Sequence, residues 1–184
     1  IYDANAIQSG DPIFTSLTCQ AVFSFEYLVS AENPVTGVGD YQLSMVLTSP
    51  NGWSHTIDQT SLTKFKGNTF HTEKPLDLCA IQKYLTFVGS TTGIERQPYS
   101  LEIRPVINYS GNIDGNLFQA QFAPVLQFRV EEQQVFLVKD TSSEADPMVP
   151  AEEGVITVDH SVPNVINILG LKLPVRTGRI ISIL

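Results

Sequence analysis

The feature that most constrains this fold is a strict alternation of apolar and polar residues near the amino terminus. Every second residue from Leu17 to Val29 is apolar, and most of the residues between them are polar. Side chains of a β-strand point alternately to its two faces, so a period of two predicts one face in a core and the other in water. We therefore expect a single long strand over 13–29.

The same alternation recurs along the chain and predicts further strands. Apolar residues alternate from Tyr41 to Leu47 and stop at Ser49–Gly52, a Ser-Pro-Asn-Gly sequence typical of turns, because Asn and Gly tolerate positive φ. Shorter strands are expected at 53–57, 66–72, 135–138 and 155–158, and a last one near the carboxyl end over 169–175.

One segment changes its period and predicts a helix. Leu78, Ile81, Leu85 and Val88 fall on one helical stripe. Pro75 and Asp77 suit a helix start, and Gly89 suits its end. The sequence therefore predicts one short helix over 76–88, packed against a sheet.

Two of the predicted strands can be aligned from the sequence alone. When the chain folds back about Asp114-Gly115, Ile103 lies opposite Leu126. Apolar residues then face one another throughout, which is what sets the register of an antiparallel pair. The other matched pairs are Leu101 with Phe128 and Ile107 with Phe122.

The same alignment sets Pro105 opposite Pro124. Proline has no N–H to donate to a sheet, so the sheet should bend, bulge or lose its pairing there. A four-residue turn over 113–116 would make these prolines a non-hydrogen-bonded pair. We therefore expect that turn in preference to a tight two-residue turn.

The predicted elements together define a fold class. Seven to nine short strands separated by turns, with one helix in a connection, are typical of a mainly β, antiparallel two-sheet β-sandwich that is immunoglobulin-like in broad architecture. A length of 184 residues fits one domain. We expect a single domain over 1–184, with 170–184 as a terminal strand or a stalk.

The charge of the chain excludes one class of partner. The formal net charge is −8, and acidic residues dominate the stretch from Glu131 to Asp159. Binding to nucleic acid needs a contiguous basic surface, so a nucleic-acid partner is not expected. The acidic stretch is best interpreted as a solvated loop.

No sequence motif assigns a catalytic, cofactor or metal site. A G-x-S-x-G nucleophile elbow is absent. His71 and Glu73 could share one strand face, but two ligands do not make a zinc site. The run from Asn112 to Asn116 faintly resembles a calcium loop, yet it lacks the distal glutamate, and a hairpin turn explains it better.

Three kinds of residue remain as candidates for special roles. Trp53 is the only tryptophan and could stack on a sugar ring, although capping the edge of the core is the more common role of such a residue. Cys19 and Cys79 could form a disulfide or could both be small core residues. The Asn108-Tyr-Ser110 sequence matches a glycosylation sequon, which has meaning only in a secreted eukaryotic protein.

Several short phrases of the sequence resemble those of a known family. They are Phe14–Thr18, Leu47–Trp53, Leu76–Leu78, Tyr99–Val106 and Phe122–Phe128. Together they are similar to an uncharacterised family of bacterial and archaeal extracytoplasmic domains that flanking transmembrane helices tether to the membrane. Some members of that family are associated with type I signal peptidases. The resemblance covers about 13–184 and implies an extracytoplasmic, membrane-tethered location, but it carries no catalytic residues, and the Ser-Lys dyad of a signal peptidase cannot be assigned here.

The carboxyl-terminal residues suggest how such a tether would begin. After Arg176 and Arg179 the chain becomes almost continuously apolar over 180–184. We expect this run to be the start of a transmembrane helix, with the two arginines at the bilayer interface. The alternative is that these five residues pack as an ordered terminal strand.

The expected function follows from these observations. We expect a non-catalytic structural or binding domain of a membrane-anchored protein, with an unidentified protein or glycan partner and no cofactor. The alternatives are a hydrolase, either a peptidase or a glycosidase, and a carbohydrate-binding module that uses Trp53.

Overall fold

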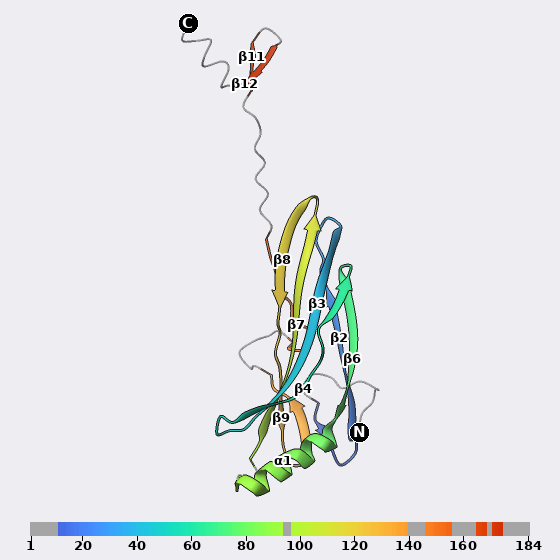
Figure 1. Cartoon of the computed structure of the whole chain (residues 1–184), viewed down its shortest axis with the longest axis vertical. Coiled ribbons are helices and arrows are strands. Elements are labelled where there is room, and N and C mark those ends of the chain that lie inside the picture. The colour runs from blue at the N-terminus through green and yellow to red at the C-terminus, as the bar shows by residue number, and fades with distance from the viewer. Residues whose placement is uncertain (1–10, 94–96, 140–145, 156–164, 169–170, 175–184) are drawn as a thin grey trace. The chain divides into compact units, whose positions relative to one another are not determined.

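The computed structural model describes residues 11–93, 97–139 and 146–155, together with the backbone of 165–168 and 171–174. The chain divides into two compact units, 1–153 and 154–184. The described residues of the first unit form an antiparallel two-sheet β-sandwich with one helix, as the sequence predicts (Figure 1). In the second unit β11 (Val165–Ile168) and β12 (Leu171–Pro174) form a hairpin. No helix among the described residues is long and apolar enough to cross a membrane.

The larger sheet of the first unit has the strand order β1-β10-β9-β7-β3-β4, with β5 also paired to β3 and β8 also paired to β7. Its strands are β1 (Ile13–Phe14), β3 (Val35–Thr48), β4 (Ser54–Gln59), β5 (Thr63–Lys66), β7 (Tyr99–Ile113), β8 (Asn116–Phe122), β9 (Leu126–Val130) and β10 (Gln134–Leu137). The smaller sheet pairs β2 (Gln20–Leu28) with β6 (Thr69–Asp77). An ion pair of 2.7 Å between Lys74 Nζ on β6 and Asp58 Oδ2 on β4 links the two sheets.

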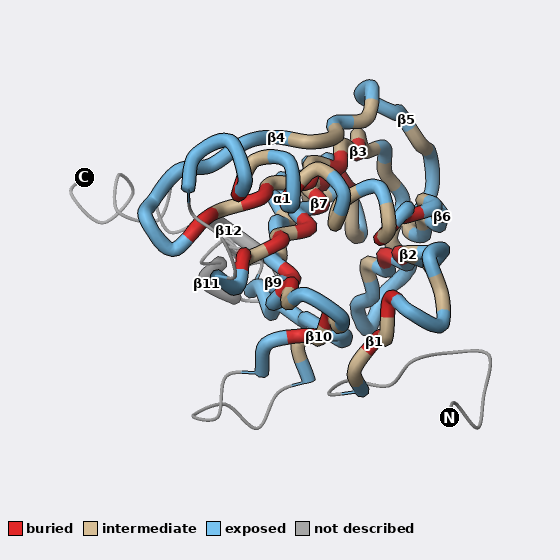
Figure 2. The backbone as a smooth tube through the Cα atoms, turned by 90° about the horizontal axis from the view of Figure 1, so that it is seen from below, coloured by how far each residue is buried: buried red, intermediate tan, exposed pale blue. Residues whose placement is uncertain are grey.

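The core lies between the two sheets, where the alternating apolar residues meet. Figure 2 shows the buried residues on the inner sides of the strands. Strands β3 and β7 supply nine of the nineteen buried hydrophobic residues among those described, because every second residue along much of each strand points inward. These inward residues are Tyr41, Leu43, Met45 and Leu47 on β3 and Tyr99, Leu101, Ile103, Ile107 and Tyr109 on β7.

The predicted register of the hairpin after the helix is confirmed. Ile103 pairs with Leu126, and the flanking matched pairs are also those expected. The predicted four-residue turn is wrong, because Asp114 and Gly115 have φ values of 53° and 84° and Ile113 pairs directly with Asn116. Two positive φ values at the central positions are typical of a tight two-residue turn.

This tight turn explains why the partner of β7 is divided into two strands. Along an antiparallel ladder, pairs two residues apart are of the same type, either hydrogen-bonded or not. Ile113 and Asn116 close the turn as a hydrogen-bonded pair, and Pro105 and Pro124 lie an even number of residues away from them. The two prolines therefore fall at a hydrogen-bonded position. Neither proline has an N–H to donate. The sheet therefore loses its pairing there, and β8 ends at Phe122 before β9 begins at Leu126.

The single long strand expected over 13–29 is wrong, because the structure divides it between the two sheets. Strand β1 pairs with β10 in the larger sheet, and β2 pairs with β6 in the smaller one. Between them the N–H groups of Leu17 and Thr18 both donate to the carbonyl of Phe14 and form a turn. Leu17 is consequently 58% exposed, although the alternation places it on the apolar face. Over 20–28 the alternation does mark the buried face of β2.

The helix α1 (Leu78–Thr92) begins and ends later than predicted. Pro75 belongs to β6, and Asp77 is the N-cap, whose carboxylate accepts a hydrogen bond of 2.8 Å from the N–H of Ala80. Gly89, the expected end, is buried within the helix, and Gly93 caps its end with a φ of 73°. A glycine with positive φ is the usual C-cap, and Gly93 fills that role in place of Gly89.

We expect Asp77→Ala to lower the free energy of unfolding by about 1 kcal/mol, because the N–H of Ala80 would lose its partner. Denaturant unfolding monitored by circular dichroism measures the loss. Asp77→Asn keeps a capping oxygen and is the matched control, with an expected loss of only a few tenths of a kcal/mol. Equal losses in the two variants would contradict a capping role.

Aromatic rings fill the core at the end of the sandwich near the β7–β8 turn. Tyr27 contacts the rings of Phe65, Tyr109 and Phe122. Glycines let these rings lie close to the larger sheet, since a Cβ at Gly39 would lie 2.4 Å from the ring of Phe65. The hydroxyls of Tyr41 and Tyr109 are buried and make no hydrogen bond within the described residues.

Burial raises the pKa of Tyr41 to about 12. An unfolded tyrosine titrates near about pH 10, so above that pH the unfolded state loses its proton first. We therefore expect the free energy of unfolding to fall as the pH rises from about 10 to about 12, with no contribution from this group below about pH 10. Absorbance at 295 nm, compared between native and urea-unfolded chains, measures the difference.

Tyr41→Phe removes the hydroxyl and is the variant that isolates this effect. It should weaken the alkaline loss of stability and should not destabilise the chain at neutral pH, because the deleted hydroxyl makes no hydrogen bond within the described residues. An unchanged stability profile above pH 10 would show that Tyr41 does not carry the effect.

Two expectations near the carboxyl end concern residues that are only partly described. The strand predicted at 155–158 lies outside the described residues except for Val155, which is not in a strand. The strand predicted over 169–175 includes β12, whereas the apolar run at 180–184 lies outside the described residues.

Candidate functional site

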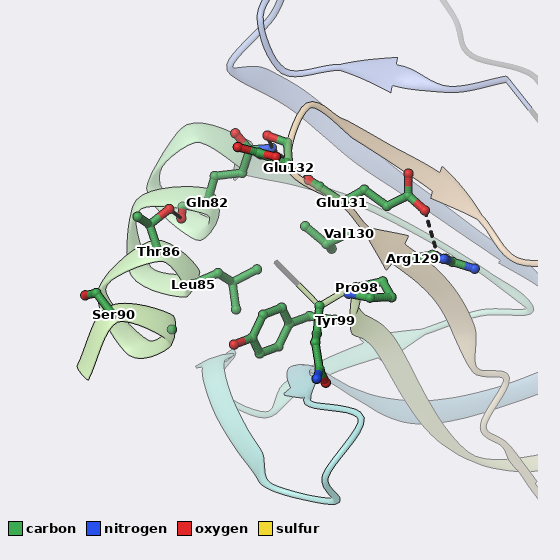
Figure 3. A pocket seen from close by; sticks show the side chains of 12 residues that line it. Gln82, Leu85, Thr86, Ser90, Pro98, Tyr99, Arg129, Val130, Glu131 and Glu132 are labelled. Carbon is green, nitrogen blue, oxygen red and sulfur yellow. Dashed lines mark hydrogen bonds and ion pairs between the residues drawn. The ribbon is translucent and has the colours of Figure 1, made fainter. Parts of the chain in front are cut away.

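A cleft of about 580 Å³ lies between α1 and the strands β7 and β9 (Figure 3). Its lining residues come from three segments of the chain: Gln82, Leu85, Thr86, Gly89 and Ser90 of α1; Gln97, Pro98 and Tyr99 at the start of β7; and Arg129, Val130, Glu131 and Glu132 at the end of β9. A volume of this size is in the range of small-molecule sites.

The position of α1 defines this cleft, and several contacts hold the helix in place. The side-chain amide of Gln82 donates to the carbonyls of Glu131 and Glu132, at 3.2 Å and 3.1 Å. A disulfide joins Cys79 in the first turn of the helix to Cys19 just before β2. The N–H of Leu78 also donates to the carbonyl of Cys19 at 2.8 Å. The helix is therefore attached both to the smaller sheet and to the β9–β10 turn.

The floor of the cleft is apolar. Leu85, Tyr99 and Val130 are all buried beneath it. The hydroxyl of Tyr99 makes no hydrogen bond within the described residues and is buried. Figure 3 shows the side chains of Leu85 and Val130 pointing toward each other across the cleft, above the ring of Tyr99.

The rim of the cleft is charged, and two of its ionic groups, Arg129 and Glu131, are paired with each other. Arg129 Nε lies 2.9 Å from Glu131 Oε1, and the guanidinium lies 5.9 Å from the centroid of the Phe136 ring. The carboxylate of Glu131 also accepts a hydrogen bond of 2.7 Å from Gln134. Glu131 is therefore held in place by two neighbours, whereas Glu132 lies beside it on the β9–β10 turn.

The threonine and serine hydroxyls of the cleft are turned toward the helix backbone. Thr86 Oγ1 donates to the carbonyl of Gln82, and Ser90 Oγ donates to that of Phe87, each at 2.9 Å. A serine or threonine nucleophile requires a neighbouring base to accept its proton. Neither His55 nor His71, the two histidines among the described residues, lines the cleft.

Trp53 lies outside the cleft, in an aromatic stack on another side of α1. Its ring and that of His55 are nearly parallel, with centroids 5.9 Å apart, and His55 stacks in turn on Tyr84 of the helix at 5.8 Å. Trp53 is 40% exposed. It therefore both covers the edge of the fold and presents part of its ring to solvent.

None of the remaining candidate residues lines the cleft. His71 Nε2 lies 3.6 Å from Glu73 Oε1, and both side chains are exposed. Among the described residues, no group of three or more His, Cys, Asp or Glu side chains is placed to hold a metal ion. Asn108 lies within β7, where its amide donates to Asp40 and accepts from Gln121. The 112–116 run forms the hairpin turn.

The structure joins Cys19 and Cys79 in a disulfide, with Cα atoms 4.9 Å apart. The bridge links the entry to β2 with the start of α1, which are separated by 60 positions in the sequence. The two cysteines therefore act as a structural link and not as small core residues.

Sequence reasoning missed the cleft as a site. Its residues come from one helix and two strand ends, and none of them forms a recognisable motif. The one available signal was Gln82, a polar residue next to the apolar stripe of α1. Its role becomes clear only from its hydrogen bond to the β9–β10 turn.

Comparisons with protein-family models, with curated proteins and with solved structures found no match.

Proposed function

We propose that this chain is a non-catalytic binding domain that acts outside the cytoplasm as part of a membrane-anchored protein. The observation that carries the proposal is the cleft beside α1, which combines an apolar floor with a charged and amide-rich rim. Binding sites for small molecules and short polymer segments commonly combine these features. The partner is a glycan or a protein segment that enters the cleft.

The chemistry of the cleft favours binding over hydrolysis. A glycosidase needs two carboxylates that flank the scissile bond, and here Glu131 is already engaged by Arg129 and Gln134. A peptidase needs a nucleophile with a base, and the hydroxyls of Thr86 and Ser90 donate to helix carbonyls.

The proposed location outside the cytoplasm is supported by the disulfide. Disulfides persist in oxidising compartments and are rare in the reducing cytosol. The resemblance to membrane-tethered extracytoplasmic domains points to the same location. Sequencing the native gene beyond Leu184 tests the anchor, which requires about 15 further apolar residues to complete a membrane span.

The binding proposal can be tested by NMR titration of the isotopically labelled chain. The probes are cellobiose, maltose, diacetylchitobiose and a library of short peptides. We expect at least one probe to shift the amide resonances of Leu85, Tyr99 and Val130. Thr86→Trp should abolish these shifts, because a large side chain would fill the cleft from its exposed rim. Lys83→Trp, on an exposed position of α1 that does not line the cleft, is the matched control.

Two results would overturn the proposal. Chromatographic detection of cleaved probe in the titration samples would show a hydrolase. The absence of any shift at the cleft across the whole panel would show that this cleft is not a binding site.

A second candidate function is sugar binding at Trp53. The specific observation is the stack of Trp53 on His55 and Tyr84, which holds a partly exposed indole ring in a fixed orientation. Sugars pack their apolar faces on such rings. Because Trp53 is the only tryptophan, its fluorescence reports directly on this site. A glycan that shifts the emission supports this candidate, and a glycan panel that leaves the emission unchanged excludes it.

A further inference from the structure

The outer edge of β8 is an unprotected strand edge among the described residues. Strand β8 pairs with β7 on one side, and no other described strand pairs with it. Because the pair that closes the turn is hydrogen-bonded, the N–H and C=O groups of Leu117, Gln119 and Gln121 point away from β7. These groups form a template for a further strand.

The edge carries none of the features that usually prevent such pairing. Natural edge strands are protected by charged side chains, prolines or bulges. Strand β8 has no proline and no charged residue, and its pairing with β7 is regular. The sequence from Gly115 to Phe128 contains no charge at all, although the net charge of the chain is −8. Leu117 is moreover 83% exposed.

We propose that two copies of this chain associate through β8, antiparallel about a two-fold axis at Gln119. In this register Gln119 lies opposite its own copy, and Leu117 lies opposite Gln121 of the other copy. Every outward-pointing N–H and C=O group of the three residues then has a partner, which a shift of the register would not achieve.

The side chains of β8 are complementary to themselves in this register. On the inner face Phe118 of each copy lies opposite Ala120 of the other. Ala120 is small and exposed, and the ring of Phe118 lies over Gly111 of β7, so neither side chain obstructs the approach of the second copy. Large and small residues at facing positions pack well across a strand pair. On the outer face the exposed Leu117 covers the aliphatic part of Gln121.

The absence of charge on β8 favours a second copy of this chain as the strand that pairs with its edge. Two chains of net charge −8 repel each other over most of their surfaces. Strand β8 itself adds nothing to this repulsion, because no charged residue lies on it. The two-fold axis also closes the assembly, so pairing stops at a dimer.

The test is the oligomeric state of the full chain by sedimentation equilibrium at about 0.5 mM, a concentration suited to a small interface. We expect the wild type to reach twice the monomer mass. Gln119→Lys should remain a monomer, because two ammonium groups would then face each other across the axis. Gln127→Lys is the matched control, since Gln127 is exposed on β9, which is paired on both sides.

Cysteine trapping tests the register. The Cα atoms of a hydrogen-bonded antiparallel pair lie about 5.5 Å apart, a distance that a disulfide spans. Gln119→Cys should therefore form a covalent dimer under mild oxidation, and Gln127→Cys should not. A wild type that is monomeric at the stated concentration, or that forms open-ended polymers, would overturn the proposal. A Gln119→Cys chain that forms no dimer would overturn it as well.

Discussion

Phe25→Ala is expected to lower the free energy of unfolding by about 3–5 kcal/mol, as truncations of buried aromatic residues do. Phe25 is 7% exposed on β2 and stacks on Phe23 and Tyr41, so its removal opens a cavity between the two sheets. Chemical denaturation of the variant and the wild type measures the difference.

Phe87→Ala is the matched control for this substitution. Phe87 lies on α1 and is 66% exposed, so the same chemical change should cost well under about 1 kcal/mol. Phe23→Ala should fall between the two, because Phe23 is only partly buried. A loss below about 1 kcal/mol for Phe25→Ala would show that the inner face of β2 is not part of the core.

Removal of the disulfide is expected to lower the free energy of unfolding by roughly 4 kcal/mol, from the chain entropy of a loop with a sequence separation of 60. The double variant Cys19→Ala with Cys79→Ala tests this by denaturant unfolding. Loss of the disulfide should also affect the cleft, because the bridge attaches the first turn of α1 to the smaller sheet. In the double variant we expect the amide resonances of the cleft to broaden or shift.

A reducing agent provides the control for the disulfide. Dithiothreitol should destabilise the wild type by about the same amount as the double variant and should not affect the double variant. An unchanged midpoint of unfolding for the reduced wild type would contradict a stabilising role of the bridge.

Much of the fold could be predicted because its signals are local. A period of two marks a strand with one buried face, and this pattern located β3, β7 and β10 and the buried face of β2. The register of β7 against β8 and β9 followed from matching apolar faces, since a shift of one residue would turn Gln127 or Arg104 into the core.

The errors arose where the decisive partner is distant in the sequence. The alternation continues through the turn at Leu17, and only the pairing of β1 with β10 and of β2 with β6 shows that the chain changes sheets there. The helix continues through Gly89, which is buried within α1. The sequence alone does not show whether a glycine ends a helix or is buried inside it. The tight turn at Asp114 sets the two prolines at a hydrogen-bonded position, and the sheet loses its pairing there.

The sequence by itself determined a β-sandwich with one helix, the faces of its main strands and the register of its longest hairpin. These depend on side-chain periodicity and on turn chemistry, which are properties of neighbouring residues. Only the tertiary structure decided the pairing of Cys19 with Cys79, the cleft beside α1 and the unprotected edge of β8. Each of these depends on which distant segments lie side by side, and no local pattern in this chain encodes that.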